Sequence, residues 1–328
     1  MPVTLFALTA AVSLAASIVL VSRLERVGER LGISEAALGL VAALAADGPE
    51  ITASVTAIAG GHGTVGIGVT LGSNVFNLAA LLGLSALLAG RIAFHRRALI
   101  LEGGLGVWVA FLALAAVGGL IGPAVALLLA CVGFVPYLAF SILPPAARAR
   151  FHLPGRLAEW LAGALADEEA ALAVMIRPHR GTNIDAVVAF GALVVVIVAS
   201  VAMEEMATNI GDQAGLSPIV VGGLILAAVT SLPNAVAAVY LASRGRSEAT
   251  LSEAFNSNLF NVIIGLLVPG ALLGLAPASG DTLVVAAAYV AMTAGAVALA
   301  FWGRGLDRRS GSVIIVAYVG FAVFLALS

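Results

Sequence analysis

Two short polar segments, 184 residues apart, interrupt apolar sequence and carry the residue types that bind cations. The first is Asp-Gly-Pro-Glu at residues 47–50, and the second is Thr-Ser-Leu-Pro-Asn at residues 230–234. Each is followed, at identical spacing, by a Ser-Asn-x-Phe-Asn element, at residues 73–77 and 257–261. Hard cations such as Ca2+ prefer the oxygens of carboxylates, amides and hydroxyls. The duplicated pattern therefore predicts a cation site assembled from two related halves of the chain.

Both segments contain a proline near the middle of a long apolar run. Proline has no N–H and clashes with the carbonyl four residues before it, so it interrupts a helix. Pro49 and Pro233 should thus deprive the carbonyls of Ala45 and Val229 of their helical partners. Inside a membrane, such groups are tolerated where they are buried in protein or line a wet cavity. We expect both carbonyls to be candidate ion ligands.

Three carboxylates belong to the same regions: Asp47, Glu50 and Glu253. A charged side chain at the centre of a bilayer costs roughly 2.5–3.5 kcal/mol on insertion scales. Because every arginine falls in a predicted loop, these acids should be neutralised by protons or by bound cations. For Glu253 an interfacial position near Arg244 and Arg246 is the alternative.

Amides and hydroxyls complete the predicted set of oxygen ligands. They are Ser73, Asn74, Asn77, Thr230, Ser231, Asn234, Asn256, Ser257, Asn258 and Asn261. Polar side chains of this kind also join membrane helices by hydrogen bonds. For Asn77 and Asn261, that structural role and direct ligation are equally supported by the sequence.

Composition indicates the environment that these residues occupy. The chain is 61% hydrophobic and 10% charged, and apolar runs of 18 or more residues are typical of transmembrane helices. The sequence predicts an all-α membrane protein with about ten spans. They are residues 4–21, 35–59, 63–89, 98–117, 121–143, 184–209, 217–242, 248–275, 281–302 and 311–327.

The arginines predict the orientation of those spans. All 16 basic residues are arginines, and they lie in the first, third, fifth, seventh and ninth loops. The positive-inside rule places these loops in the cytoplasm and both termini outside. The fifth loop, residues 144–183, separates five spans in residues 1–143 from five in residues 184–328. An odd number of spans per half makes the two halves inverted repeats, with the repeated motifs at about 39–83 and 222–267.

Other polar residues give weaker signals. Glu204 and Glu205, near the end of the sixth span, are either an entry site for ions or interfacial, and Glu102 is equally ambiguous. The four histidines fall in loops, which argues against a histidine or zinc site in mid-membrane. No sequence motif for ATP binding or hydrolysis is present. We therefore expect a protein that is not an enzyme and has no cofactor.

The repeated motifs resemble the alpha repeats of the sodium/calcium exchanger family, the calcium/cation antiporters. Residues 47–50 with Gly72, Ser73 and Asn74 resemble the first repeat, and residues 230–233 with Ser257 and Asn258 resemble the second. The resemblance implies an antiporter that binds Ca2+ and a counter-ion alternately at one central site. It also implies that Glu50 is a main calcium ligand.

The chain departs from the family pattern at several positions. Asn234 replaces the glutamate of the second repeat, and Ala46-Asp47 replaces a Thr-Ser pair in the first. Where the family has Asn or Asp before the Gly-Ser-Asn element, this chain has Val69 and Glu253, and Asn256 replaces that element's glycine in the second repeat. The acids are thus redistributed rather than lost, and the pattern matches neither the sodium-coupled nor the proton-coupled branch in full.

Together these features predict a secondary active cation antiporter that exchanges Ca2+ for Na+ or H+ by alternating access. The alternatives are exchange of another cation (Mg2+, Mn2+, or a monovalent ion for H+) and a non-transporting membrane protein that retains the exchanger fold. The expected partners are the lipid bilayer and inorganic cations, not nucleic acid, and the oligomeric state is left open. We expect a multi-pass protein of a bacterial or archaeal plasma membrane.

Overall fold

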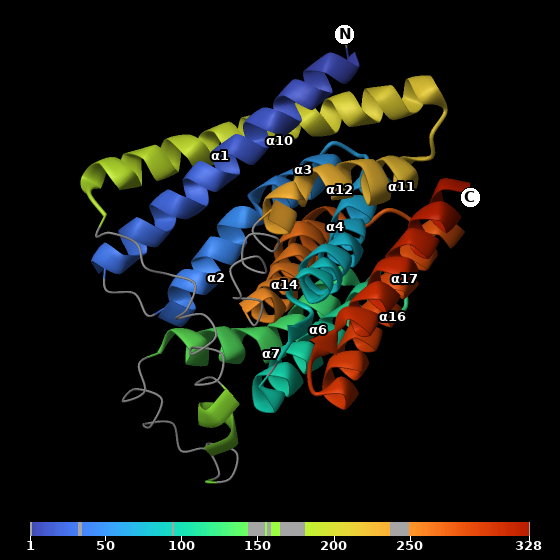
Figure 1. The fold of residues 1–328 in the computed structure, drawn as a ribbon. Helices are drawn as coiled ribbons and strands as arrows, with labels where there is room; N and C mark the ends of the chain where they lie inside the picture. The colour runs from blue at the N-terminus through green and yellow to red at the C-terminus, as the bar shows by residue number, and fades with distance from the viewer. Residues whose placement is uncertain are drawn as a thin grey trace.

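The computed structural model describes residues 2–31, 35–93, 95–143, 155, 159–164, 181–236 and 249–327, and these are nearly all helical (Figure 1). The first half contains α1 (Pro2–Leu31), α2 (Glu35–Ala46), α3 (Gly48–Ala59), α4 (Gly63–Asn77), the π-helix η1 (Leu78–Leu84), α5 (Ser85–Ala89), β1 (Arg91–Ile92), α6 (Arg96–Val117) and α7 (Pro123–Ile142). The second contains α10 (Asn183–Ala214), α11 (Pro218–Val220), η2 (Val221–Leu226), α12 (Ala227–Thr230), α14 (Ala249–Phe260), η3 (Asn261–Leu267), α15 (Val268–Leu273), α16 (Gly280–Gly303), β2 (Leu306–Asp307) and α17 (Arg308–Leu327).

Eight helical segments of the described chain are long and apolar enough to cross a membrane. They match eight of the predicted spans: Val3–Gly28, Gly63–Ala89, Arg96–Val117, Pro123–Ile142, Asn183–Ala214, Thr250–Leu273, Gly280–Gly303 and Arg308–Leu327. The other two predicted spans, 35–59 and 217–242, are the ones that contain Pro49 and Pro233. Each is a helix interrupted in its middle, and the second is described as far as residue 236.

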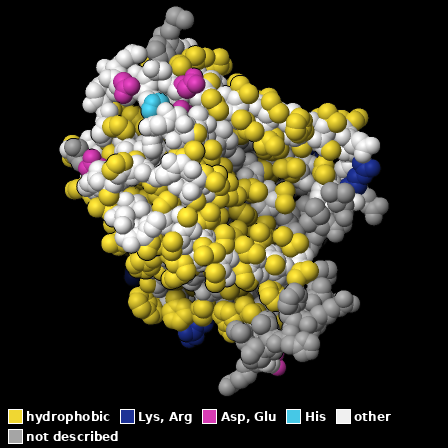
Figure 2. Space-filling view, turned by 180° about the vertical axis from the view of Figure 1, so that it is seen from behind, with side chains coloured by type: hydrophobic (Ala, Val, Ile, Leu, Met, Phe, Trp, Pro, Cys, Tyr) yellow, Lys and Arg dark blue, Asp and Glu magenta, His cyan; other side chains and the backbone are white. Residues whose placement is uncertain are grey.

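The surface is that of a membrane-embedded protein. Large apolar side chains are exposed along α1, α7, α10 and α17, with Val132, Phe190 and Val316 more than half exposed. Figure 2 shows hydrophobic side chains over the middle of one face, arginines at its lower and right-hand rims, and acidic side chains with a histidine at the upper end. An exposed apolar belt between charged rims fits a multi-pass membrane protein.

Two helices of unusual length, α1 and α10, lie side by side along one edge of the molecule (Figure 1). Asp185, near the start of α10, pairs with Arg23 of α1 at 2.7 Å. The start of α10 is fixed by a capping box in which Thr182 and Asp185 satisfy each other's backbone N–H groups. Among the described residues, neither helix contributes to the largest buried apolar cluster. Met203 and Ala207 of α10 pack in a smaller cluster with Ala53 of α3 and Val65 of α4.

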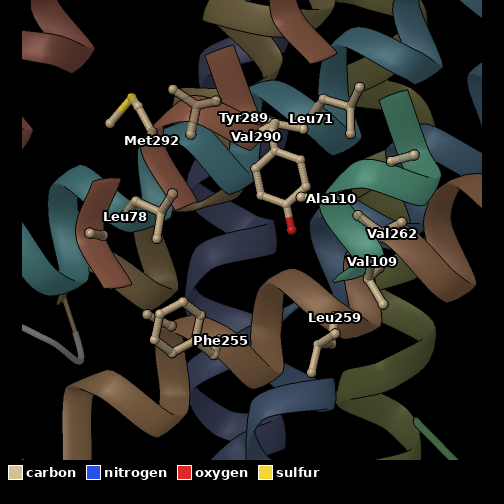
Figure 3. Packing of buried hydrophobic residues seen from close by; sticks show 14 of the residues in the cluster. Leu71, Leu78, Val109, Ala110, Phe255, Leu259, Val262, Tyr289, Val290 and Met292 are labelled. Carbon is tan, nitrogen blue, oxygen red and sulfur yellow. The ribbon is translucent and has the colours of Figure 1, made fainter. Parts of the chain in front are cut away.

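The core is built around α4 and α14, the most buried of the spanning segments. Figure 3 shows Leu71 of α4, Phe255 and Leu259 of α14, and Tyr289 of α16 in one apolar cluster. Phe255 and Tyr289 have no exposed surface. Because α4 and α14 carry the two Ser-Asn-x-Phe-Asn elements, this packing places both elements at the centre of the molecule.

At one end of the molecule, two short strands join the halves. Arg91 of β1 pairs with Asp307 of β2 in antiparallel register. Asp307 also precedes α17 and accepts hydrogen bonds from the backbone N–H and the hydroxyl of Ser310. These donors favour the ionised carboxylate and lower the pKa of Asp307. The contacts fix where α17 begins.

Candidate ion-binding site

The two proline-containing helices break at equivalent positions. The first is interrupted at Asp47 and the second at Ser231, which are 184 residues apart and each two residues before a proline. Their backbone dihedrals are nearly the same, with φ −77° and ψ −2° at Asp47 and φ −81° and ψ 1° at Ser231. The predicted breaks are therefore present, but each is a single-residue interruption rather than a long unwound segment.

Five side chains from both halves of the chain meet between these breaks. The Asn234 amide donates hydrogen bonds to Asp47 Oδ1 at 2.9 Å and to Glu50 Oε1 at 3.1 Å. The Ser257 hydroxyl donates to Asp47 Oδ1 at 2.6 Å. Asn77 donates from Nδ2 to Ser257 Oγ at 3.1 Å. These five residues are at most 1% exposed, so two carboxylates are enclosed in the core by amide and hydroxyl donors.

Each carboxylate nevertheless retains an unsatisfied oxygen. Asp47 Oδ2 and Glu50 Oε2 are buried without a hydrogen-bond partner among the described residues, and so are Asn77 Oδ1 and Asn234 Oδ1. Within that same part of the chain, neither carboxylate forms an ion pair with an arginine or a histidine. A buried ionised carboxylate without a counter-charge is very unfavourable. The donor set therefore fits a cation or protons as the missing partner.

The asparagines of the two Ser-Asn-x-Phe-Asn elements bond to one another across the halves. Asn74 Nδ2 donates to the Asn258 carbonyl at 3.1 Å, and Asn258 Nδ2 donates to the Asn74 carbonyl at 3.2 Å. Asn261 donates to Asn74 Oδ1 at 3.1 Å, and Asn77 makes the equivalent contact with Asn258 Oδ1 at 3.4 Å. Asn77 and Asn261 therefore both join helices by hydrogen bonds, which is one of the two roles predicted for them. Asn77 also reaches the site through Ser257.

A π-helical turn begins at the end of each of these elements. The π-helix η1 begins at Leu78, directly after Asn77, and η3 begins at Asn261. A π-turn widens the helix by one residue and occurs frequently at functional sites. These turns could not be predicted from the sequence, since neither begins at a proline or at a change in composition.

Ser73 and Thr230 hold α4 against α12. The Ser73 hydroxyl lies 3.4 Å from the Ala227 carbonyl and 3.5 Å from Thr230 Oγ1, while Thr230 donates to the Leu226 carbonyl at 2.9 Å. The two residues are buried beside the site and bond to the backbone in this structure, and their ligation of an ion stays a prediction. Ser231 is fully buried at the second break. Ligation by the carbonyls of Ala45 and Val229 stays a prediction.

Next to Ser73, the two halves approach each other through glycines. A Cβ added at Gly72 would lie 2.6 Å from Gly223 Cα, and one added at Gly68 would lie 2.8 Å from Gly223 N. No real side chain atom fits at such distances, so α4 and η2 are in backbone contact here. Small residues allow this kind of close packing between membrane helices.

Two predicted site residues are not brought into the cluster. Glu253 is partly buried and lies one helical turn before Ser257 in α14. The described residues contain no group of three or more His, Cys, Asp or Glu side chains arranged to hold a metal, so the predicted meeting of three carboxylates is absent from this structure. Asn256 points to another helix, where its Oδ1 accepts a hydrogen bond from Tyr137 at 3.0 Å. The alternative contacts of Glu253 with Arg244 and Arg246 lie outside the described residues.

The remaining acids have distinct environments. Glu204 is buried, and its Oε1 lies 3.3 Å from His62 Nδ1 and accepts a hydrogen bond from Thr208. Its neighbour Glu205 is exposed. Glu102 is buried in α6 and accepts a hydrogen bond from Ser252 at 2.9 Å. The exact burial of Glu204 and Glu102 could not be inferred from their positions near the ends of predicted spans.

Comparison with known proteins agrees with this arrangement. The sequence profile of the family described as "Sodium/calcium exchanger protein" matches residues 1–144 and 184–327, which include both helix breaks and both Ser-Asn-x-Phe-Asn elements. The chain belongs to the sodium/calcium exchanger family. The expected family resemblance is thereby confirmed over nearly the whole membrane-embedded chain.

Relatives of this exchanger-family chain include proteins of similar and of much greater length. A putative antiporter CaxA from Alkalimonas amylolytica is 27% identical over 315 residues, covering 91% of this chain and 90% of the relative. Sodium/potassium/calcium exchanger 4 from Homo sapiens is 31% identical over 142 residues, covering 40% of this chain. The matched region spans only 22% of that human protein.

Solved structures confirm the fold of the family. YfkE superimposes with a TM-score of 0.68 at 18% identity, covering 98% of this chain and 92% of YfkE. The H+/Ca2+ exchanger CAX gives 0.67 at 16% identity, covering 99% and 86% of the two chains. The sodium-calcium exchanger NCX_Mj gives 0.60 at 21% identity, covering 97% and 96%. The predicted all-helical exchanger architecture is therefore correct.

Proposed function

We propose that the protein is a secondary active cation antiporter that exchanges Ca2+ for Na+ or H+ by alternating access. The observation that carries the proposal is the pair of buried carboxylates, Asp47 and Glu50, each with one unsatisfied oxygen. The relatives named as antiporters and the H+/Ca2+ and sodium-calcium exchangers of the same fold support it. Asp47, Glu50, Asn77, Asn234 and Ser257 would form the ion site.

The charge of the pair suits Ca2+. Two ionised carboxylates carry a charge of −2, which one Ca2+ or two monovalent cations would balance. Ca2+ takes six to eight oxygens at about 2.3–2.6 Å, and the unsatisfied oxygens of Asp47, Glu50, Asn77 and Asn234 supply four of these. Other candidate oxygens are the hydroxyls of Ser231 and Ser257.

Asn234 would change its role when a cation binds. In this structure its Nδ2 donates to both carboxylates, while its Oδ1 has no partner among the described residues. Rotation of the amide by half a turn would direct Oδ1 to the space between the carboxylates. That orientation is repulsive unless a cation lies there, so the amide acts as a placeholder for the ion.

Exchange follows from the burial of the site. An empty site with two ionised carboxylates is costly to move through a low-dielectric interior, whereas a site neutralised by Ca2+, Na+ or protons is not. Movement between inward-open and outward-open states would thus require a bound ion. In this proposal the two halves are inverted repeats, the termini are outside, and α1 with α10 moves against the core, as in transporters built from such repeats.

Ion-dependent stabilisation tests the site directly. The purified protein in detergent should unfold at a higher temperature as Ca2+ is added, because a ligand that binds only the native state stabilises it by mass action. Glu50→Gln should lose this shift, and Glu205→Gln, a change in an exposed acid, should keep it. Parallel titrations with Na+, Mg2+ and Mn2+ and at several pH values identify the competing ions. Absence of stabilisation by any of them would favour a non-transporting protein that keeps the fold.

A further inference from the structure

Between α1, α10 and α2 lies a crevice with almost entirely apolar walls and a volume of about 360 Å3. Its walls include Leu20 and Leu24 of α1, Val41 and Ala45 of α2, and Ala189 and Leu193 of α10. Ligand pockets in proteins span about 300–1,000 Å3. A crevice at the lower end of that range, with these walls, accepts part of a hydrocarbon chain and not a polar solute.

Arginines lie at one end of this crevice. On α1, Leu20, Leu24 and Val27 line it at helical spacing, and Arg30 follows Val27 by three residues on the same side of the helix. On α10, Asn183 precedes the lining residue Ala186 by three residues in the same way. Arg30 Nη1 donates to Asn183 Oδ1, so the polar end of the crevice is bordered by an exposed arginine.

Two more arginines, Arg23 and Arg26, lie on the adjoining face of α1. Arg23 and Arg26 lie 2.7 and 3.6 Å from the same oxygen of Asp185, and the spacing of residues 23, 26 and 30 puts all three on one side of the helix. One carboxylate is therefore shared by Arg23 and Arg26, and the Arg26 side chain remains 42% exposed. A guanidinium has five N–H donors, so Arg26 and Arg30 keep donors beyond these contacts with which to bind an anion at the end of the crevice.

We propose that this crevice binds one anionic phospholipid, with an acyl chain between α1, α10 and α2 and the phosphate group against Arg26 and Arg30. The apolar walls fit the chain, and the positive charge at one end fits the head group. The wall residue Ala45 lies two positions before the break at Asp47, so the bound chain contacts α2 directly beside the candidate ion site. The proposal concerns lipid binding and does not depend on which ions are transported.

Lipid retention by the full-length protein tests the proposal. The protein is delipidated in detergent, incubated with phosphatidylglycerol or with phosphatidylcholine of the same chain length, and examined by native mass spectrometry. We expect one tightly held phosphatidylglycerol, and weaker retention of phosphatidylcholine. A basic side chain near an anionic lipid contributes about fivefold in binding, equivalent to about 1 kcal/mol. Arg26→Gln with Arg30→Gln should thus reduce phosphatidylglycerol retention by roughly 25-fold and leave phosphatidylcholine unchanged.

Filling the crevice tests the acyl-chain half of the proposal. Leu193→Trp adds bulk to the crevice wall and should reduce retention of both lipids. Val132→Trp, on the lipid-facing surface of α7, and Arg309→Gln, an exposed arginine at the start of α17, are the matched controls and should behave as wild type. Equal retention of the two lipids by the wild type, or an unchanged preference for phosphatidylglycerol in the double arginine variant, would overturn the proposal.

Discussion

Asn74 and Asn258 donate their side-chain amides to each other's backbone carbonyls, at 3.1 and 3.2 Å, from equivalent positions 184 residues apart. Such a reciprocal contact, in which each residue meets its own counterpart, is what a two-fold relation between two units produces. Glu50 and Asn234 are a second pair at the same separation and are also hydrogen-bonded. Both pairs join equivalent positions of the two halves of the chain, and the inversion of the repeats stays a prediction.

The asparagine pair should contribute strongly to stability. Asn74→Ala and Asn258→Ala each remove one donation of the reciprocal pair, together with the contact that the side chain accepts from Asn261 or Asn77. Each buried partner left unsatisfied costs about 1–3 kcal/mol of unfolding free energy. The double variant should be less destabilised than the sum, because both bonds depend on the same approach of α4 to α14. Chemical unfolding in detergent measures this, with the exposed Asn209→Ala as control. Strict additivity would mean that the two bonds are independent.

The glycine contact between α4 and η2 should not tolerate a side chain. Gly72→Ala introduces a Cβ that overlaps the backbone of Gly223, and overpacking of this kind costs about 1–3 kcal/mol or more. Gly104→Ala in α6 meets nothing within 4 Å, so it should be neutral or stabilise the helix by up to about 1 kcal/mol. Thermal unfolding of the two variants compares them. Similar stabilities would show that the helices separate easily here.

The two carboxylates should each be necessary for Ca2+ binding. Glu50→Gln and Asp47→Asn remove one negative charge but keep the size of the side chain. We expect each to weaken Ca2+ binding by at least about tenfold, or 1.4 kcal/mol, and the Glu205→Gln protein to bind like the wild type. Isothermal titration calorimetry provides the affinities. Wild-type affinity in the Asp47→Asn protein would exclude Asp47 as a ligand.

If Asn234 is a placeholder for the ion, adding a carboxylate at this position should strengthen Ca2+ binding. Asn234→Asp replaces the donating amide with a third carboxylate, so the ion-free protein should be less stable because like charges repel. Ca2+ should then bind more tightly and raise the unfolding temperature more than in the wild type. Asn234→Leu should lower stability without this gain, since it removes the amide donor to Glu50 and leaves Asp47 with the Ser257 hydroxyl. An unchanged Ca2+ response in Asn234→Asp would place Asn234 away from the ion.

The fold was largely predictable because its signals are local. Apolar runs of membrane-spanning length define the helices, and Pro49 and Pro233 locate the breaks to within two residues. The repeat at offset 184 identifies the residues that meet at the centre. These features depend on composition and spacing, which the chain displays directly.

The details of the site depend on packing and were harder to predict. From the sequence, Glu253 was assigned to the ion site together with Asp47 and Glu50. In the structure, the orientation of α14 about its own axis directs Ser257 to Asp47 and Asn256 to Tyr137. The same orientation leaves Glu253 partly buried, one helical turn before Ser257. The donation from Asn234 to both carboxylates and the π-turns η1 and η3 arise from contacts between distant segments, and no local pattern marks them.

Transport by the reconstituted protein shows directly whether it exchanges calcium for Na+ or H+. Proteoliposomes loaded with Na+, or with an acidic interior, are diluted into medium that contains radioactive calcium, and uptake is compared with that of liposomes without a gradient. We expect calcium uptake driven by one of the two gradients, and background uptake by the Glu50→Gln protein under the same conditions. Wild-type uptake no greater than that of empty liposomes with either gradient would contradict the proposed exchange.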